Sequence, residues 1–237
     1  MTTTGTGHRE GLRERKKRAM RGQLSDTAAR MFLEHGFDAV RVADVAEACG
    51  VSEKTAFNYF PRKEALILDR LETTADALRT HLADPALPPV AAMLKILDAE
   101  LHAVGTSLTA TDDPEQALSD YRRFGDLIRT TPALRAYQSD IAERCTEAAA
   151  EVLATRSGFD PAEPEPQAAA AALLGLWRVQ FRALRTHLRP GHPIEEALTA
   201  VTDEVNRAAA LIRDGLTTFP AAGDELRDQR AAPGVHP

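Results

Sequence analysis

The chain has 237 residues and a formal net charge of −6, and its 43% hydrophobic content is enough for a core in one domain or in two tightly packed ones. It contains no run of about 18 apolar residues, and its N-terminus is polar and then basic, so we expect neither a membrane span nor a secretory signal. The two cysteines, Cys49 and Cys145, belong to no CxxC or Cys/His cluster, which favours a cytoplasmic protein with reduced thiols and no metal site.

The hydrophobic spacing is helical throughout, which predicts an all-α fold of about nine helices. Residues 1–8 are small and polar and are expected to be disordered. The predicted helices cover residues 10–34, 42–49, 53–60, 62–82, a segment starting at 88, 114–129, 132–156, 167–188 and 194–216. Gly36 is expected to end the first helix in the left-handed conformation, and Gly158 to end the seventh. Residues 158–166 are predicted to be a proline-rich connection, and residues 220–237 a flexible tail.

Residues 42–60 carry the pattern of a helix-turn-helix, in which two short helices cross steeply over a small core. Ala46 is small where the helices must approach, and Gly50 can adopt the positive φ of the turn. Ser52 can cap the second helix, and Glu53 suits the positive end of its dipole. A helical hairpin inside a larger bundle is the alternative. The cap, the apolar pattern and the neighbouring basic segment favour DNA binding.

The second helix of this motif would lie in the major groove, with its N-terminal residues at the base edges. Asn58 can pair with adenine, Lys54 can reach guanine or a phosphate, and Glu53 can accept a hydrogen bond from cytosine. Thr55 and Phe57 can contact a thymine methyl group. Each of these side chains therefore has usable chemistry for reading bases.

Charge is divided unevenly along the chain. Residues 1–70 carry 13 Lys and Arg against 10 Asp and Glu, whereas residues 71–237 carry 16 against 25. The positive excess is densest at residues 9–21, where the predicted phosphate or minor-groove contacts are Arg15, Lys16 and Lys17. A longer, solvated first helix is the alternative explanation. A basic end on an acidic body suits a protein that presents one face to a polyanion.

Residues 29–66, ARMFLEHGFDAVRVADVAEACGVSEKTAFNYFPRKEAL, resemble the DNA-binding domain of the TetR family. The GFD, the D-V-A…G-V-S turn, the NYF and the KE occur in the family's order. The resemblance implies a homodimer with two operator-contacting domains, a ligand pocket among the middle helices and dimerisation through the last two. It divides the chain into a helix-turn-helix domain with a basic extension at residues 9–66 and a ligand-binding and dimerisation domain at residues 67–219.

The resemblance also implies roles for single residues. Arg41 and Val42 would lie near the DNA backbone. Tyr59 would hydrogen-bond a phosphate, and Lys63 would contact a phosphate at the start of the fourth helix. Many family members have a tyrosine where this chain has Phe57, which puts one phosphate contact of the family in doubt.

The second half contains the candidates for a small-molecule pocket, which is usually apolar with a few placed polar groups. The ligand-binding candidates are the apolar residues Leu97, Leu101, Phe124, Tyr137, Trp177 and Phe181, together with Arg178. His102, Arg123 and Gln180 are further polar candidates. Ordinary core for the rings and surface positions for the polar residues are the alternatives. Loose similarity to actinobacterial TetR regulators associated with acyl-CoA-like ligands favours a small hydrophobic or acyl-type effector.

Together these features predict a transcriptional regulator and not an enzyme, since no nucleophile elbow, metal cluster or phosphate-binding loop is visible and no cofactor is expected. The hypothesis is a ligand-released repressor that binds double-stranded DNA as a homodimer at an inverted repeat. The small-residue run at 168–172 and the apolar side of the last helix are the predicted dimer seam. The rivals are an activator, a ligand-independent DNA-binding protein and an all-α enzyme.

Overall fold

The computed structural model describes residues 11–215, without the side chains of residues 12–13, 69–73 and 214–215. Over that range the chain forms nine α-helices and no strand, which confirms the all-α prediction. It divides into two compact units, unit 1 (Met1–Asp69) and unit 2 (Arg70–Pro237). The predicted disorder at residues 1–8 and tail at residues 220–237 lie outside the described residues. Within residues 11–215, no helix is apolar over a length that would cross a bilayer.

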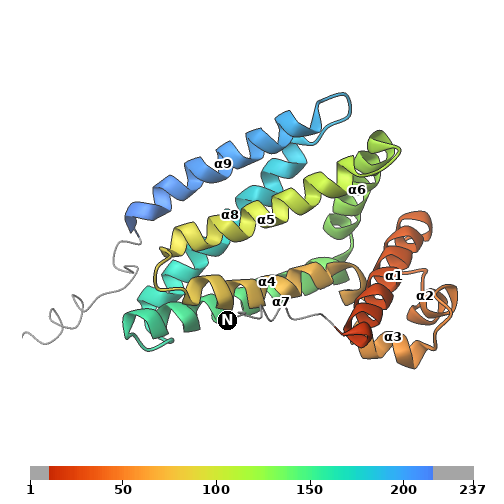
Figure 1. The fold of residues 1–237 in the computed structure, drawn as a ribbon, viewed down its shortest axis with the longest axis horizontal. Helices are drawn as coiled ribbons and strands as arrows, with labels where there is room; N and C mark the ends of the chain where they lie inside the picture. The colour runs from red at the N-terminus through yellow and green to blue at the C-terminus, as the bar shows by residue number, and fades with distance from the viewer. Residues whose placement is uncertain (1–10, 216–237) are drawn as a thin grey trace, which may run out of the picture. The chain divides into compact units, whose positions relative to one another are not determined.

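Unit 1 contains α1 (Leu12–His35), α2 (Val42–Ala48), α3 (Glu53–Tyr59) and the start of α4 (Ala65–Ala83) (Figure 1). α2 packs against both α1 and α3. The rings of Phe32 and Phe37 lie 5.1 Å apart between their centroids. The other side chains of this small core include Leu24, Ala28, Val40, Val45, Ala46, Ala56, Phe60 and Leu66.

Unit 2 is a helical bundle of the rest of α4 with α5 (Pro89–Thr109), α6 (Pro114–Thr130), α7 (Pro132–Ser157), α8 (Pro164–His187) and α9 (Ile194–Gly215). α8 packs against α7 and α9, and α5 packs against α6, α8 and α9 (Figure 1). Gly105 allows a close approach of α5 to α9, because a Cβ atom there would lie 2.7 Å from Cδ1 of Leu198. Unit 2 therefore has its own core, separate from that of unit 1.

Two helices, α4 and α8, begin three residues away from their predicted positions. α4 begins at Ala65 and not at residue 62, because residues 62–64 form a tight turn in which each carbonyl accepts from the amide three residues on. α8 begins at Pro164, three residues before the predicted start. Prolines fit the first turn of a helix because its amides have no intrahelical partner, so the proline-rich connection is shorter than expected.

The glycines at two helix ends differ in conformation. Gly158 has φ 71° and ψ 20°, the left-handed conformation that commonly ends a helix. Gly36 has φ 85° and ψ 154°, so its predicted left-handed helical conformation is wrong. Its φ is positive while its ψ is extended, a region that is essentially restricted to glycine. Both positions require glycine, for different turns of the chain.

Candidate nucleic-acid interface

The turn between α2 and α3 is a Schellman motif. Gly50 has φ 69°, and its amide donates to the carbonyl of Glu47 at 3.0 Å. The amide of Val51 donates to the carbonyl of Ala46, also at 3.0 Å. These bonds satisfy carbonyls at the end of α2 while the chain reverses direction, which confirms the predicted positive φ at Gly50. The turn fixes the direction in which α3 leaves α2.

Ser52 caps α3 at its N-terminus, as predicted. Its Oγ accepts a hydrogen bond from the amide of Thr55 at 3.1 Å and lies 2.8 Å from the Thr55 hydroxyl oxygen. Glu53 follows in the first turn, where a carboxylate interacts favourably with the helix dipole. Because the Thr55 hydroxyl is engaged with Ser52, the Thr55 methyl group is the part of that side chain suited to a base contact.

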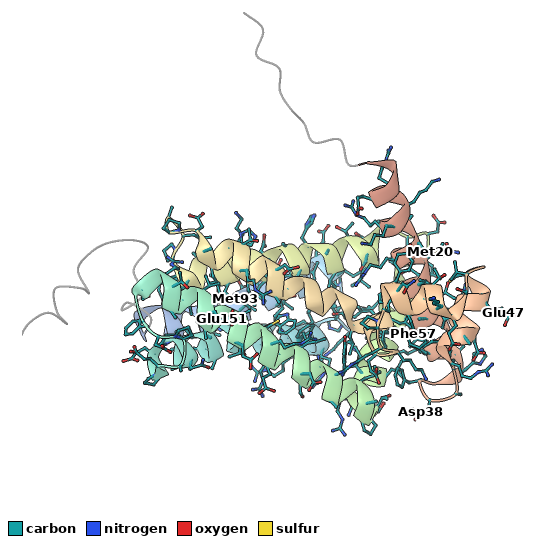
Figure 2. The ribbon with its side chains drawn as sticks, turned by 90° about the horizontal axis from the view of Figure 1, so that it is seen from below. Met20, Asp38, Glu47, Phe57, Met93 and Glu151 are labelled. Carbon is teal, nitrogen blue, oxygen red and sulfur yellow. The ribbon has the colours of Figure 1, made fainter. Side chains whose placement is uncertain are left out.

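α3 has a buried face and an exposed face. Ala56 is fully buried, and Phe60, directly after the helix, is 1% exposed. Thr55 and Tyr59 are half-buried at the border between the faces. Phe57, labelled in Figure 2, is 41% exposed and is one of three exposed large apolar side chains among the described residues. The other exposed side chains of α3 are Glu53, Lys54 and Asn58. The base-reading candidates are therefore accessible, and their contacts with DNA remain predictions.

Two cations hold α3 and its neighbours in place inside unit 1. Nη1 of Arg21 donates to the carbonyl of Tyr59 at 3.1 Å, and its guanidinium lies 4.7 Å from the centroid of the Phe60 ring. Nζ of Lys63 donates to the carbonyl of Phe37 and lies 4.3 Å from the centroid of that ring. Partial burial lowers the pKa of Lys63. The Lys63 ammonium keeps two further N–H donors, and its phosphate contact stays a prediction.

The other predicted backbone contacts differ in their surroundings. Arg41 stands at the N-cap of α2 and is highly exposed, with Nη2 2.6 Å from Oδ1 of Asp44. Their side-chain hydrogen bond raises the pKa of Arg41 and lowers the pKa of Asp44. Val42 is buried, so only its backbone can face a phosphate. The basic residues predicted to contact DNA from α1 are all exposed: Arg15, Lys16 and Lys17.

Unit 2 contains a half-buried carboxylate that joins three helices. Glu100 on α5 accepts a hydrogen bond from the Thr74 hydroxyl on α4 and another from Nε1 of Trp177 on α8, each at 2.8 Å. Thr74 is 2% exposed and Trp177 is 3% exposed. Burial raises the pKa of Glu100, and the two donors oppose this effect. On the next turn, Nε2 of Gln180 donates to the carbonyl of Leu97 at 3.1 Å.

The predicted pocket residues are divided between the core and the surface of unit 2. The ring of Phe181 lies 5.1 Å from that of Trp177 and is 36% exposed, and Arg178 is exposed. Phe124 is half-buried. The buried candidates are Leu97, Leu101, Tyr137 and Trp177. Of the further polar candidates, His102 and Arg123 are exposed, whereas Gln180 is buried. The structure brings Leu97, Trp177 and Gln180 together beside Glu100.

Sequence reasoning missed Glu100 and Thr74. The available signal was the position of Glu100 in a helix whose neighbouring residues Ile96, Leu97 and Leu101 are apolar. Its partners come from α4 and α8, which are far away in the sequence, so the pattern could mark the position but not the contacts. Within residues 11–215 there is also no group of three His, Cys, Asp or Glu side chains suited to a metal ion.

Comparison with known families places this geometry in a class. The model described as "Bacterial regulatory proteins, tetR family" matches residues 24–69, and the model described as "MftR C-terminal domain" matches residues 94–210. The chain belongs to the TetR family and is a DNA-binding transcriptional regulator with a helix-turn-helix. The first match covers the turn and α3, and the second covers most of unit 2.

Individual relatives agree with this assignment. A protein of Mycobacterium tuberculosis named as the mycofactocin biosynthesis transcriptional regulator MftR is 31% identical over 185 residues, 77% of this chain and 87% of that protein. The HTH-type transcriptional regulator TcmR of Streptomyces glaucescens is 30% identical over 169 residues, 67% of this chain and 70% of that protein. These two relatives confirm the predicted family and regulatory class. Among solved structures, the chain is similar to native NalD, the secondary repressor of the MexAB-OprM multidrug efflux pump in Pseudomonas aeruginosa, with 19% identity and a TM-score of 0.48 over 81% of this chain and 97% of that one.

Proposed function

We propose that the protein is a ligand-released repressor that acts in the cytoplasm and binds an inverted-repeat operator as a homodimer. Two copies of α3 would enter successive major grooves about 34 Å apart. The observation that carries this proposal is the exposed face of α3, with Lys54, Phe57 and Asn58 accessible on a helix held by the Ser52 cap and the Gly50 turn. These three side chains point to solvent and do not contribute to the core of unit 1.

The proposed dimer uses the outer faces of α8 and α9. Leu211 on α9 is 85% exposed, which is more than any other large apolar side chain described, and Phe181 on α8 is also exposed. The small residues Ala168 and Ala171 are exposed on α8 and would let a partner helix approach closely. An isologous four-helix seam around a two-fold axis would cover these surfaces.

The effector is proposed to be a small hydrophobic or acyl-type molecule held in unit 2. Support comes from the apolar surroundings of Leu97, Leu101 and Trp177 and from the few polar groups among them. The MftR-type C-terminal match covers this region at residues 94–210. Binding there would alter contacts of α4, the helix within which the chain passes from unit 2 to unit 1.

Two contacts hold the unit 2 part of α4. Thr74 donates to Glu100, as described above. Near the end of α4, Nη1 of Arg156 donates to the carbonyl of Leu82 at 2.8 Å and to the carbonyl of Leu87 at 3.0 Å. Arg156 thereby satisfies a C-terminal carbonyl of α4 and ties it to the end of α7. In the proposed mechanism the Arg156 end stays fixed while the Thr74 end moves when a ligand binds.

The first experiment measures binding of the purified full chain to labelled DNA from upstream of its own gene. Wild type is compared with Lys54→Ala and with Lys95→Ala, a matched control because Lys95 is exposed on α5 in unit 2. Loss of the Lys54 contact should cost about 1–3 kcal/mol, or roughly 5- to 150-fold in affinity. Equal affinities for the two variants would reject the assignment of α3 as the DNA-reading helix.

The second experiment tests coupling between effector and operator. By thermodynamic linkage, an effector that weakens operator binding must itself bind more weakly when the operator is present, by the same factor. Titrations of a bound acyl ligand with and without operator DNA should differ by this factor. Identical ligand affinities would reject release by ligand while leaving DNA binding intact.

A further inference from the structure

Glu100 and Gln180 occupy adjacent positions on two antiparallel helices of unit 2. On α5, Leu97 and Glu100 are one turn apart, and on α8, Trp177 and Gln180 are one turn apart. The hydrogen bonds pair Leu97 with Gln180 and Glu100 with Trp177, so the two polar side chains lie on neighbouring levels of one interface. This interface also contains Thr74 from α4.

Gln180 presents an acceptor oxygen that the described protein leaves unused. The side chain is 3% exposed, and its one hydrogen bond among the described residues runs from Nε2 to the carbonyl of Leu97. That bond fixes the amide orientation, because a carbonyl can accept only from the nitrogen. Every fully enclosed side-chain nitrogen or oxygen among the described residues has a partner, so Oε1 of Gln180 is not fully enclosed and accounts for part of the small exposed fraction of this side chain.

Glu100 presents further acceptor capacity beside it. Its two oxygens each receive one neutral donor, from Thr74 and Trp177, although a carboxylate offers about four lone-pair sites. Within the described residues no Lys or Arg forms an ion pair with Glu100, and burial without a cation opposes its charge. The interior of unit 2 therefore gathers oxygens that accept, with too few groups that donate to them.

We propose that Glu100 and Gln180 form the polar end of an effector site that accepts the hydrogen-bond donor of an apolar ligand, an alkylammonium or an alcohol, and that rejects a carboxylate. The inference rests on the proposed sensor function of unit 2. Of the two effector classes proposed above, it favours a small hydrophobic molecule that carries a donor and excludes a free fatty acid. A donor would fill the acceptor oxygens of both side chains, whereas a carboxylate would place an acceptor, with its negative charge, against Glu100.

Trp177 makes the site observable without DNA. It is the single tryptophan of the chain, and its indole N–H donates to Glu100, so its emission reports directly on this carboxylate. The experiment titrates the purified full chain at neutral pH with three probes of equal chain length: decylamine, decanol and decanoate. We expect the emission of Trp177 to change with the amine and the alcohol, and both to bind at least about tenfold more tightly than decanoate.

Variants separate recognition from general apolar binding. Glu100→Gln should reduce the amine affinity about tenfold or more and narrow the gap between amine and decanoate. Gln180→Met removes the second acceptor at similar volume and should weaken both donor probes. Asp98→Asn is the matched control, since Asp98 is an exposed carboxylate two residues away on α5, and it should behave as wild type.

Thr74→Val keeps the inference testable if Glu100→Gln fails to fold. Valine has the shape of threonine without the hydroxyl, so the variant frees one oxygen of Glu100, and amine affinity should rise. A fall in amine affinity, decanoate binding as tight as decylamine in wild type, or no binding of either donor probe would each overturn the proposal. The Trp177 titrations contain no DNA. Failure to bind an operator in the separate DNA experiment would therefore reject the repressor proposal without affecting the ligand preference measured here.

Discussion

Units 1 and 2 place their informative polar side chains in opposite directions. In unit 1, Lys54 and Asn58 face outward from α3. The start of that helix is fixed by contacts close in sequence, the Gly50 turn and the Ser52 cap, and Arg21 on α1 holds its end. In unit 2, Glu100 and Gln180 face inward and are held by partners 26 to 83 residues away. The comparison teaches that a short local motif can orient a DNA-facing helix such as α3. The Glu100 and Gln180 pair, in contrast, requires helices that are far apart in the sequence to pack together.

The largest expected effect is a selective loss of unit 1. Phe32 is 1% exposed and stacks against Phe37 in a small core, so Phe32→Ala should cost about 3–5 kcal/mol. We expect unit 1 to melt at lower temperature and DNA binding to be lost, while unit 2 keeps its own transition in calorimetry. Lys95→Ala, at an exposed position of α5 with no proposed role, is the control. A single transition that shifts as a whole would break the distinction between the units.

The next effect concerns the dimer surface of unit 2. Leu211→Glu would bury a charge in the proposed seam and should weaken the dimer by about 2–3 kcal/mol, or roughly 30- to 150-fold. Light scattering over a concentration series measures this. Ala99→Glu adds the same charge at an exposed position of α5 and should leave the dimer unchanged. Equal behaviour of the two variants would place the seam elsewhere.

A pH effect should be confined to unit 2. The pKa of Glu100 is raised from its ordinary value of 4.5, so the folded state holds the proton more tightly than the unfolded state. The stability this gives is present below pH 4.5 and is lost as pH rises through the folded pKa. Melting temperatures of unit 2 between pH 4.5 and 7 should therefore fall more steeply in wild type than in Glu100→Gln. Equal slopes of melting temperature against pH in wild type and Glu100→Gln would contradict a raised pKa of Glu100. The control Asp98→Asn should have the same slope as wild type.

The smallest expected effect is the order in which the two cysteine thiols react with a labelling reagent. Each unit carries one cysteine, and both are buried: Cys49 in unit 1 and Cys145 in unit 2. Burial raises the pKa of Cys145 to about 11, so native protein at pH 8 should react very slowly there. As urea is added, Cys49 should label first, because the smaller unit buries less surface. Mass spectrometry of labelled peptides would show the order. Earlier labelling of Cys145 would contradict the expectation that unit 1 unfolds before unit 2.

Sequence reasoning succeeded where structure is local. The positive φ of Gly50, the Ser52 cap and the start of α3 follow from residues within one or two turns, and all three were predictable. The engagement of Lys63 with the Phe37 carbonyl was not predictable, because it depends on how the turn before α4 packs against the loop after α1. The early start of α8 was missed because prolines that end a helix can also begin one.

The same limit explains the interior of unit 2. Leu97 and Trp177 could be proposed as pocket residues from their apolar spacing, and Gln180 as a polar candidate, but no pattern indicated that they would meet. The apolar neighbours of Glu100 could mark its position on sequence alone, but not its partners. Only the packing of α5 against α8 gives it Trp177 as a partner and shields part of it from water.

The central claim is that side chains of α3 read bases, and the most direct test is base discrimination by Asn58. Wild type and Asn58→Ala are compared on operator variants mutated one base pair at a time. The account predicts that Asn58→Ala loses about 1–3 kcal/mol of discrimination at one symmetric pair of positions and binds the other substitutions in the wild-type order. An unchanged preference at every position, or a uniform loss across all sequences, would contradict it.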